Sequence, residues 1–124
     1  MATWRDIATE NENAAKQLHR GLYRSAVSRA YYAAYAAVVG RLVASGAVSD
    51  HNPSHKDLPV MVEGNVPGLS DWQRRDLKAI TRRMYDARLG ADYRATMEVG
   101  ARTAFQTLSD LARALRLLQG EVTR

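Results

Sequence analysis

Three residues close together near position 90 have side chains that could act jointly on a phosphate group. Arg88 and Asp92 are four positions apart, and Tyr93 follows directly. On a continuous helix this spacing places Arg88 and Asp92 on one side. One interpretation is a structural ion pair that closes the helix end and orients Tyr93. The other is a phosphate-binding or catalytic site, because a guanidinium group can hold a phosphate through two parallel hydrogen bonds.

Tyrosines in the segment before Arg41 form a second candidate site. Tyr31 and Tyr32, with Tyr35 after them, could stack on nucleic-acid bases beside the arginines of the same segment. The alternative is that they belong to a buried helix, where each ring fills the core and each hydroxyl finds one partner.

A basic stripe forms a third candidate site. Arg74, Lys78 and Arg82 recur every fourth residue, and they could contact the phosphates of a nucleic acid. The alternative is a solvated helix surface balanced by Asp71 and Asp76. The net charge of +5 fits RNA, DNA or an acidic protein as a partner.

His55 is the histidine that could take part in catalysis, because it would lie beside Arg88 if its loop folded back. The alternative is that His55 is a solvated residue or a contact at the start of a helix. His51 stands four residues before it, but Pro53 between them argues against a regular helical metal pair. With no third ligand in sight we predict no metal site. The chain has no cysteine, which excludes disulfides, thiolate sites and a cysteine nucleophile. Without a glycine-rich phosphate loop we expect no cofactor.

The elements that must position these residues are helices, since apolar residues recur at helical spacing and no segment alternates with a period of two. We expect a first helix capped by Thr3, with an apolar side from Trp4 to Leu22 and an end near Gly21. A second helix is predicted over 24–45, stopped by Gly46, and a last one over 101–119, ending at Gly120.

Between these lies a loop region over 47–68, with a short helix predicted over about 54–63. Asn65 to Gly68 is expected to form a turn. Ser70 and Gln73 have the spacing of a capping box, which starts the helix that carries Arg88. Gly90 predicts an end or a bend in that helix.

Two rows of residues at alternating steps of four and three, which we call seams, predict how the helices pack. Small residues follow each other at steps of four and three in the second helix: Ala26, Ala30, Ala33, Ala37, Gly40 and Ala44. Larger ones do so in the last helix: Ala104, Leu108, Leu111, Leu115 and Leu118. Such seams favour shallow-angle bundle packing. We therefore predict one all-α domain over 1–124, an up-and-down four-helix bundle with an additional short helix. The small-residue seam could pack within the chain or form half of a dimer interface.

No apolar run approaches the roughly 20 residues of a membrane helix. The longest candidate, 30–44, is broken by Arg41 and contains three tyrosines. The N-terminus is charged early and lacks the apolar core of a signal peptide. We expect a cytoplasmic protein without membrane contact.

Three segments in order resemble the small stand-alone HEPN proteins. They are YRSAVSRAYYAAYAAVVGRL at 23–42, Ser-His-Lys at 54–56, and Arg88-Leu-Gly-Ala-Asp-Tyr93. The resemblance covers about residues 14–119. It implies an up-and-down helical bundle, usually a homodimer. It also implies pairing with a minimal nucleotidyltransferase in a toxin–antitoxin or defence module, or ribonuclease activity.

The sequence departs from the Arg-x4–6-His motif that the ribonuclease members share, because no histidine follows Arg88. Metal-free RNA cleavage needs a base, an acid and a cation for the phosphorane. Arg88 could supply the cation, and Asp92 lies where the histidine could sit. An aspartate, with an ordinary pKa of about 3.9, is a poor proton donor at neutral pH, and a tyrosine, with a pKa of about 10, is a weak base.

Three hypotheses remain. The first is a dimeric interaction module that binds RNA or a nucleotide near Arg88, with a nucleotidyltransferase-type partner. The second is a metal-independent ribonuclease toxin that uses Arg88 with Asp92, Tyr93 or His55. The third is a bundle that only oligomerises.

Overall fold

The computed structural model describes residues 3–18, 21–46, 55, 58–94, 96 and 98–119, and these form five helices with no strand among them. The four long helices are α1 (Trp4–Leu18), α2 (Tyr23–Ala44), α4 (Asp71–Tyr93) and α5 (Ala101–Leu118). The short helix α3 (Leu58–Asn65) precedes α4. The predicted all-α fold with one additional short helix is confirmed.

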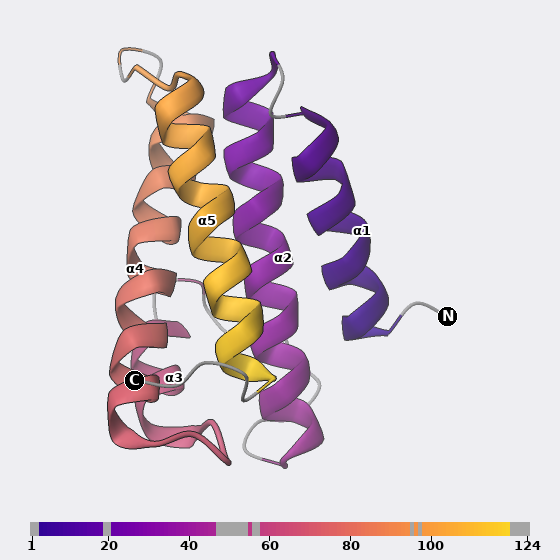
Figure 1. Ribbon diagram of the computed structural model, residues 1–124, viewed down its shortest axis with the longest axis vertical. Helices are drawn as coiled ribbons and strands as arrows, with labels where there is room; N and C mark the ends of the chain where they lie inside the picture. Colours follow the sequence, from indigo (N-terminus) through magenta and orange to yellow (C-terminus); the bar gives the residue numbers. More distant parts are fainter. Residues whose placement is uncertain are drawn as a thin grey trace.

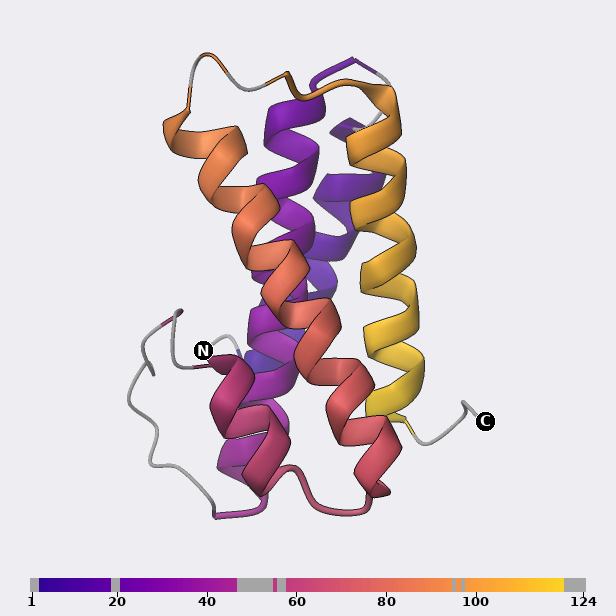
Figure 2. The ribbon, with the colours of Figure 1, turned by 90° about the vertical axis from the view of Figure 1, so that its left-hand side faces the viewer.

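The long helices run alternately up and down, with α2 in the middle (Figure 1). Helix α2 contacts each of the other four, so it is the central helix of the bundle. Helix α3 lies beside the first half of α4, as the perpendicular view shows (Figure 2). The second half of α4, which carries Arg88, therefore packs against α2 and α5.

Local sequence signals fix the starts of two helices. Thr3 Oγ1 accepts a hydrogen bond from the Asp6 amide, and the Asp6 carboxylate accepts one from the Thr3 amide, both at 3.0 Å. Ser70 and Gln73 form the same reciprocal arrangement at the start of α4. Each satisfies amides that a helix start leaves without a partner. The end of α2 is followed by Gly46 at φ +78°, a conformation that favours glycine.

Both predicted seams lie in the core, but not along their whole length. In the small-residue seam Ala26, Ala30 and Ala33 are buried, whereas Ala44 is exposed. Gly40 lies so close to α1 that a Cβ atom added to it would be 2.9 Å from the Cβ of Trp4. The seam therefore serves packing within the chain over much of its length. In α5, Ala104, Leu111 and Leu118 are buried, and Leu108 and Leu115 pack partly buried against the core.

Two ion pairs join α4 to α5 outside the apolar core. The Asp110 carboxylate accepts hydrogen bonds from Arg83 Nη2 at 2.8 Å and Nε at 3.3 Å. Asp76 accepts from Arg113 Nε at 2.7 Å. Asp110 is buried, so its two bonds to one guanidinium offset the loss of water around its charge.

Three local predictions were wrong. Leu22, assigned to the apolar side of the first helix, is instead the N-cap of α2 and is 60% exposed. Of the end or bend predicted at Gly90, the end is wrong, because α4 continues to Tyr93 and Gly90 is buried within it. The short helix α3 ends at Asn65 rather than near 63, so Asn65 belongs to that helix and not to the turn; its predicted start near 54 falls on residues outside those described. Residues 19, 20, 47–54, 56, 57 and 120, on which other expectations fall, lie outside the described residues.

Within the described part of the chain, no helix has both the length and the apolar composition needed to cross a membrane.

Candidate functional site: an arginine beneath three tyrosines

The side chain of Arg88 lies between α2 and α4 and is only 10% exposed. Its Nε donates to Asp92 Oδ2 at 3.0 Å, and its Nη2 donates to the hydroxyls of Tyr32 at 2.8 Å and Tyr93 at 3.3 Å. The guanidinium carbon also lies 5.3 Å from the ring centres of Tyr32 and Tyr93, within cation–π range. Because α4 continues through Gly90, Arg88 and Asp92 share one side of the helix, as their spacing predicted.

The charge of Arg88 is held firmly in place. Burial acts to lower the pKa of its guanidinium group, but the partial negative charges at Tyr32 and Tyr93 and the carboxylate of Asp92 outweigh burial, so the net pKa is raised. The site is therefore a permanent cation. Asp92 also accepts a hydrogen bond from the Ser28 hydroxyl at 3.2 Å, which fixes the carboxylate from the α2 side.

Another arginine of α2 positions the end of α4. Arg24 Nη1 lies within 3.0–3.2 Å of the carbonyl oxygens of Gly90, Ala91 and Arg94. These carbonyls belong to the last turn of a helix, where no amide remains to pair with them. A positive charge at this end also complements the helix dipole. Arg24 thus joins the start of α2 to the segment that carries Asp92 and Tyr93.

His55 does lie at this cluster. Its Nδ1 lies 2.9 Å from the Tyr31 hydroxyl, and its ring centre is 4.3 Å from that of Tyr35 and 5.7 Å from that of Tyr32. The Tyr31 hydroxyl can donate to Nδ1 or accept from it, depending on the tautomer. Burial, followed by the charge of Arg88, lowers the pKa of His55 below its usual value. This imidazole is therefore neutral near pH 7.

The tyrosines divide between core and site. Tyr31 is 1% exposed and packs within the main core, so its ring cannot stack on a base. Burial raises the pKa of its hydroxyl, and the charge of Arg88 offsets only part of that shift. Tyr32 is partly buried and Tyr93 is 70% exposed. Of the two tyrosines predicted to bind a ligand, only Tyr32 reaches the surface.

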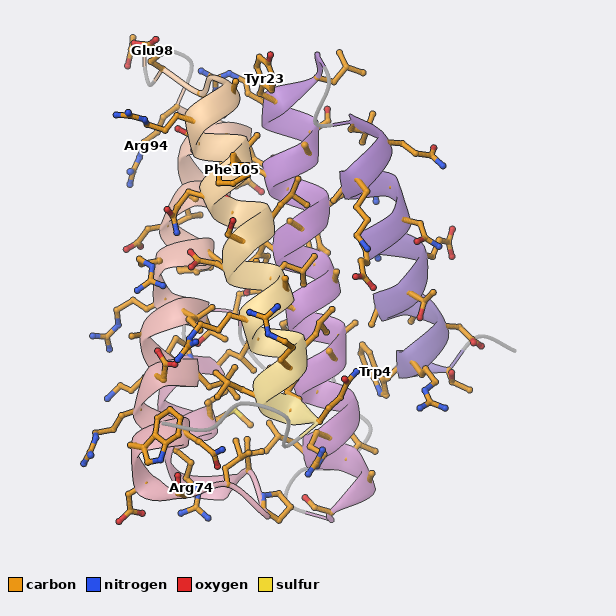
Figure 3. The ribbon with its side chains drawn as sticks, in the orientation of Figure 1. Trp4, Tyr23, Arg74, Arg94, Glu98 and Phe105 are labelled. Carbon is orange, nitrogen blue, oxygen red and sulfur yellow. The ribbon has the colours of Figure 1, made fainter. Side chains whose placement is uncertain are left out.

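The basic stripe on α4 stands apart from this cluster. Arg74 Nε donates to the carbonyl of Val66 at 3.1 Å, which ties the start of α4 to the preceding loop. Figure 3 shows Arg74 at one end of the bundle and Arg94, just after Tyr93, at the other. Lys78 is partly buried, whereas Arg82 is exposed. The three predicted phosphate contacts therefore do not converge on Arg88.

The sequence reasoning placed Arg24 and Arg29 beside the tyrosines, but it missed Ser28 and the role of Arg24 at the end of α4. A signal for both was present, because Arg24, Ser28 and Tyr32 are spaced by four residues and so lie on one side of α2. Nothing in the sequence indicated that this side packs against the end of α4.

Together these residues can hold an anion and move a proton. Arg88 supplies the charge, and His55 supplies a neutral imidazole that can accept a proton. In the described part of the chain no three histidine or acidic side chains are grouped so as to hold a metal ion.

We predict that the imidazole of His55 titrates below the usual pKa of 6.5 in the folded protein. Because the unfolded chain then binds more protons than the folded one, the contribution of His55 to stability is complete above this pH and is lost as pH falls. A proton NMR titration measures the pKa directly, with His55→Gln identifying the resonance. A midpoint at or above 6.5 would show that His55 is not held in this site.

Comparison with known families gives one match and one absence. No curated protein matches the chain. The model of the HEPN domain matches residues 1–120 of the 124, which includes every element of the bundle and all residues of the Arg88 cluster. The chain belongs to the HEPN-domain family.

Proposed function

We propose that this protein is a dimeric HEPN module that binds RNA at the end of the bundle where Arg88 lies. Family membership supports a module related to nucleotides or RNA in general. The observation that carries the proposal is the buried Arg88, held in one orientation by Asp92, Tyr32 and Tyr93. Water screens the charge of a buried cation less than that of a solvated one, and Asp92 offsets part of this charge.

The charges near Arg88 favour an anionic partner. Arg24 and Arg29 line a hollow that also contains Asp92, and Arg94 follows the end of α4. With Arg88 these are four arginines. Asp92 neutralises the charge of one of them, so the net charge of the group remains positive. The net charge of +5 acts in the same direction over the whole chain.

The remaining parts of the proposal come from the family resemblance. HEPN domains commonly dimerise, and we propose a homodimer that works with a nucleotidyltransferase-type partner in a toxin–antitoxin or defence module. Phe105 on the outer side of α5 is 70% exposed, an apolar side chain that a second copy could cover (Figure 3).

A second candidate, a metal-independent ribonuclease, is favoured by the position of His55. Its neutral imidazole lies on Tyr31, whose ring centre is 5.9 Å from the guanidinium carbon of Arg88. The site thus combines a cation for the phosphorane with a proton acceptor for the 2′-hydroxyl. In this reading His55 replaces the histidine that would follow Arg88, and Asp92 with Tyr93 orients the guanidinium.

One experiment separates the candidates. Purified protein is mixed with fluorescent single-stranded RNA in EDTA, and binding is followed by anisotropy and cleavage by gel. Arg88→Lys keeps the positive charge but loses the planar guanidinium group that donates to both Asp92 and Tyr32. Arg116→Lys, on the exposed side of α5, is the matched control. Binding without cleavage, weakened about tenfold in Arg88→Lys only, supports the RNA-binding module.

Cleavage that Arg88→Lys and His55→Gln abolish would identify a ribonuclease instead. Absence of both binding and cleavage in a folded protein would leave the purely oligomerising bundle. Light scattering on the same sample measures whether it is a dimer.

A further inference from the structure

Two surface hollows meet beside Tyr32, and both are lined by Arg29 and Tyr32. The first, of about 620 Å³, lies between α1, α2 and His55. The second, of about 380 Å³, lies between α2 and the end of α4. They share two lining residues, so they lie next to each other along α2, and we name the pair the Tyr32 groove.

The first hollow has aromatic walls. Trp4, Tyr32, Tyr35 and His55 are among its lining residues. Tyr35 is buried, whereas Trp4, Tyr32 and His55 are partly exposed. Trp4 projects from the first turn of α1 toward α2 (Figure 3) and meets the ring of Tyr35 edge to face at 6.3 Å. Rings that approach from several directions suit a flat aromatic group, since nucleic-acid bases stack on aromatic side chains with little preference for sequence. The volume lies within the range of small-ligand pockets, about 300–1,000 Å³.

The second hollow is polar, with hydroxyls, a guanidinium group and a carboxylate. Ser25, Ser28, Arg29 and Asp92 line it. The only hydrogen bond of the exposed Arg29 among the described residues is a long one, 3.4 Å, to Asn11. Its guanidinium group can therefore turn to a phosphate at the junction of the two hollows. Asp92 accepts through Oδ2 from Arg88 and Ser28, and Oδ1 remains able to accept from a hydroxyl group.

We infer that the Tyr32 groove binds one dinucleotide step of single-stranded RNA. The ribose of the first nucleotide lies in the polar hollow, with its 2′-hydroxyl donating to Asp92. The phosphate that follows lies at the junction on Arg29, and the next base stacks in the aromatic hollow. The order agrees with the covalent structure of RNA, in which each 2′-hydroxyl is adjacent to the following phosphate.

The carboxylate decides between the two nucleic acids. Asp92 repels a phosphate placed directly against it but gains a hydrogen bond from a 2′-hydroxyl, which DNA lacks. This inference rests on the proposed RNA-binding function and adds the kind of RNA, the place of each group and the preference for ribose.

The test compares RNA and DNA oligonucleotides of one sequence by fluorescence anisotropy at several salt concentrations, using the full chain. We expect RNA to bind about tenfold more tightly than DNA, as one hydrogen bond to a charged acceptor allows. Arg29→Ala is expected to weaken RNA binding and to reduce the slope of log K against log salt by about 0.7, the value for one lost phosphate contact on a single strand. Arg116→Ala removes the same charge from the exposed side of α5, outside both hollows, and should change the slope less.

A third variant tests the aromatic hollow. His55→Ala removes one ring and is expected to weaken RNA binding by about fivefold or more, as loss of one base stack does. Thermal unfolding of each variant checks that the protein remains folded.

The outcomes separate this inference from the function on which it rests. One outcome would overturn the Tyr32 groove and leave the proposed function standing. In that outcome RNA binding depends on Arg88, Arg29→Ala has no effect, and the affinities for RNA and DNA are equal. Absence of any RNA binding by the folded wild type would overturn both.

Discussion

Replacing Arg88 with alanine is expected to lower the free energy of unfolding by about 3 kcal/mol, because it breaks a largely buried charge pair and leaves its partners unpaired. Among the described residues Asp92 would keep only its hydrogen bond from Ser28, and the Tyr32 hydroxyl would lose its 2.8 Å donor. Since Asp92 is 27% exposed, water can reach it, so we place the loss at the lower end of the range for buried pairs.

Urea denaturation of the wild type and of Arg88→Ala measures the loss, and Arg82→Ala is the matched control. Arg82 is an exposed arginine of the same helix, and its removal is expected to change stability by less than about 0.5 kcal/mol. Equal effects of the two substitutions would show that the contacts of Arg88 do not stabilise the fold. The expected loss is also the reason to use Arg88→Lys in the binding experiment, where the fold must be kept.

Replacing Gly40 with leucine is expected to destabilise the protein by about 3 kcal/mol, because the space for a side chain at this position is already filled. Even a single added carbon would lie 2.9 Å from Trp4 Cβ. That atom is fixed to the backbone of α1, so relief requires the first turn of α1 to move away from α2. Trp4 lines the aromatic hollow of the Tyr32 groove, and the same movement should weaken any base stacking there.

Gly64 provides the control in a helix where no close neighbour exists. A Cβ atom added at Gly64 would meet nothing within 4 Å, so Gly64→Ala is expected to raise stability by about 0.5 kcal/mol through the lower entropy of the unfolded chain. Opposite signs for the two glycine substitutions, measured by thermal unfolding, would confirm the close approach of α1 to α2. A Gly40→Leu protein as stable as the wild type would contradict it.

Two errors in the sequence reasoning have different physical causes. Leu22 was assigned to a buried side because it continues the spacing of α1, but the chain turns at Gly21 and the periodicity ends with the helix. Gly90 was expected to end or bend its helix, since glycine lowers helix propensity by about 1 kcal/mol. Arg24 offsets that cost by binding the carbonyl oxygens of the last turn. The first error is therefore local, whereas in the second a residue of a neighbouring helix stabilises the local structure.

What the sequence determined by itself was the set of helices and much of their packing. Apolar spacing, the capping residues Thr3 and Ser70 and the stop at Gly46 are local signals, and local hydrogen bonds and burial follow directly from them. The spacing of Arg88 and Asp92 likewise predicted their pairing, because residues four apart on a helix are neighbours whatever surrounds them.

Only the tertiary structure decided which residues join that pair. His55 stands 33 positions before Arg88, and Tyr32 stands 56 before it. Their meeting depends on where His55 lies against α2 and on which side of α2 packs against α4. No local spacing records such contacts, since they arise from the burial of one core shared by all five helices. The fold was therefore readable from the chain, whereas the candidate site became visible only when distant helices were packed together.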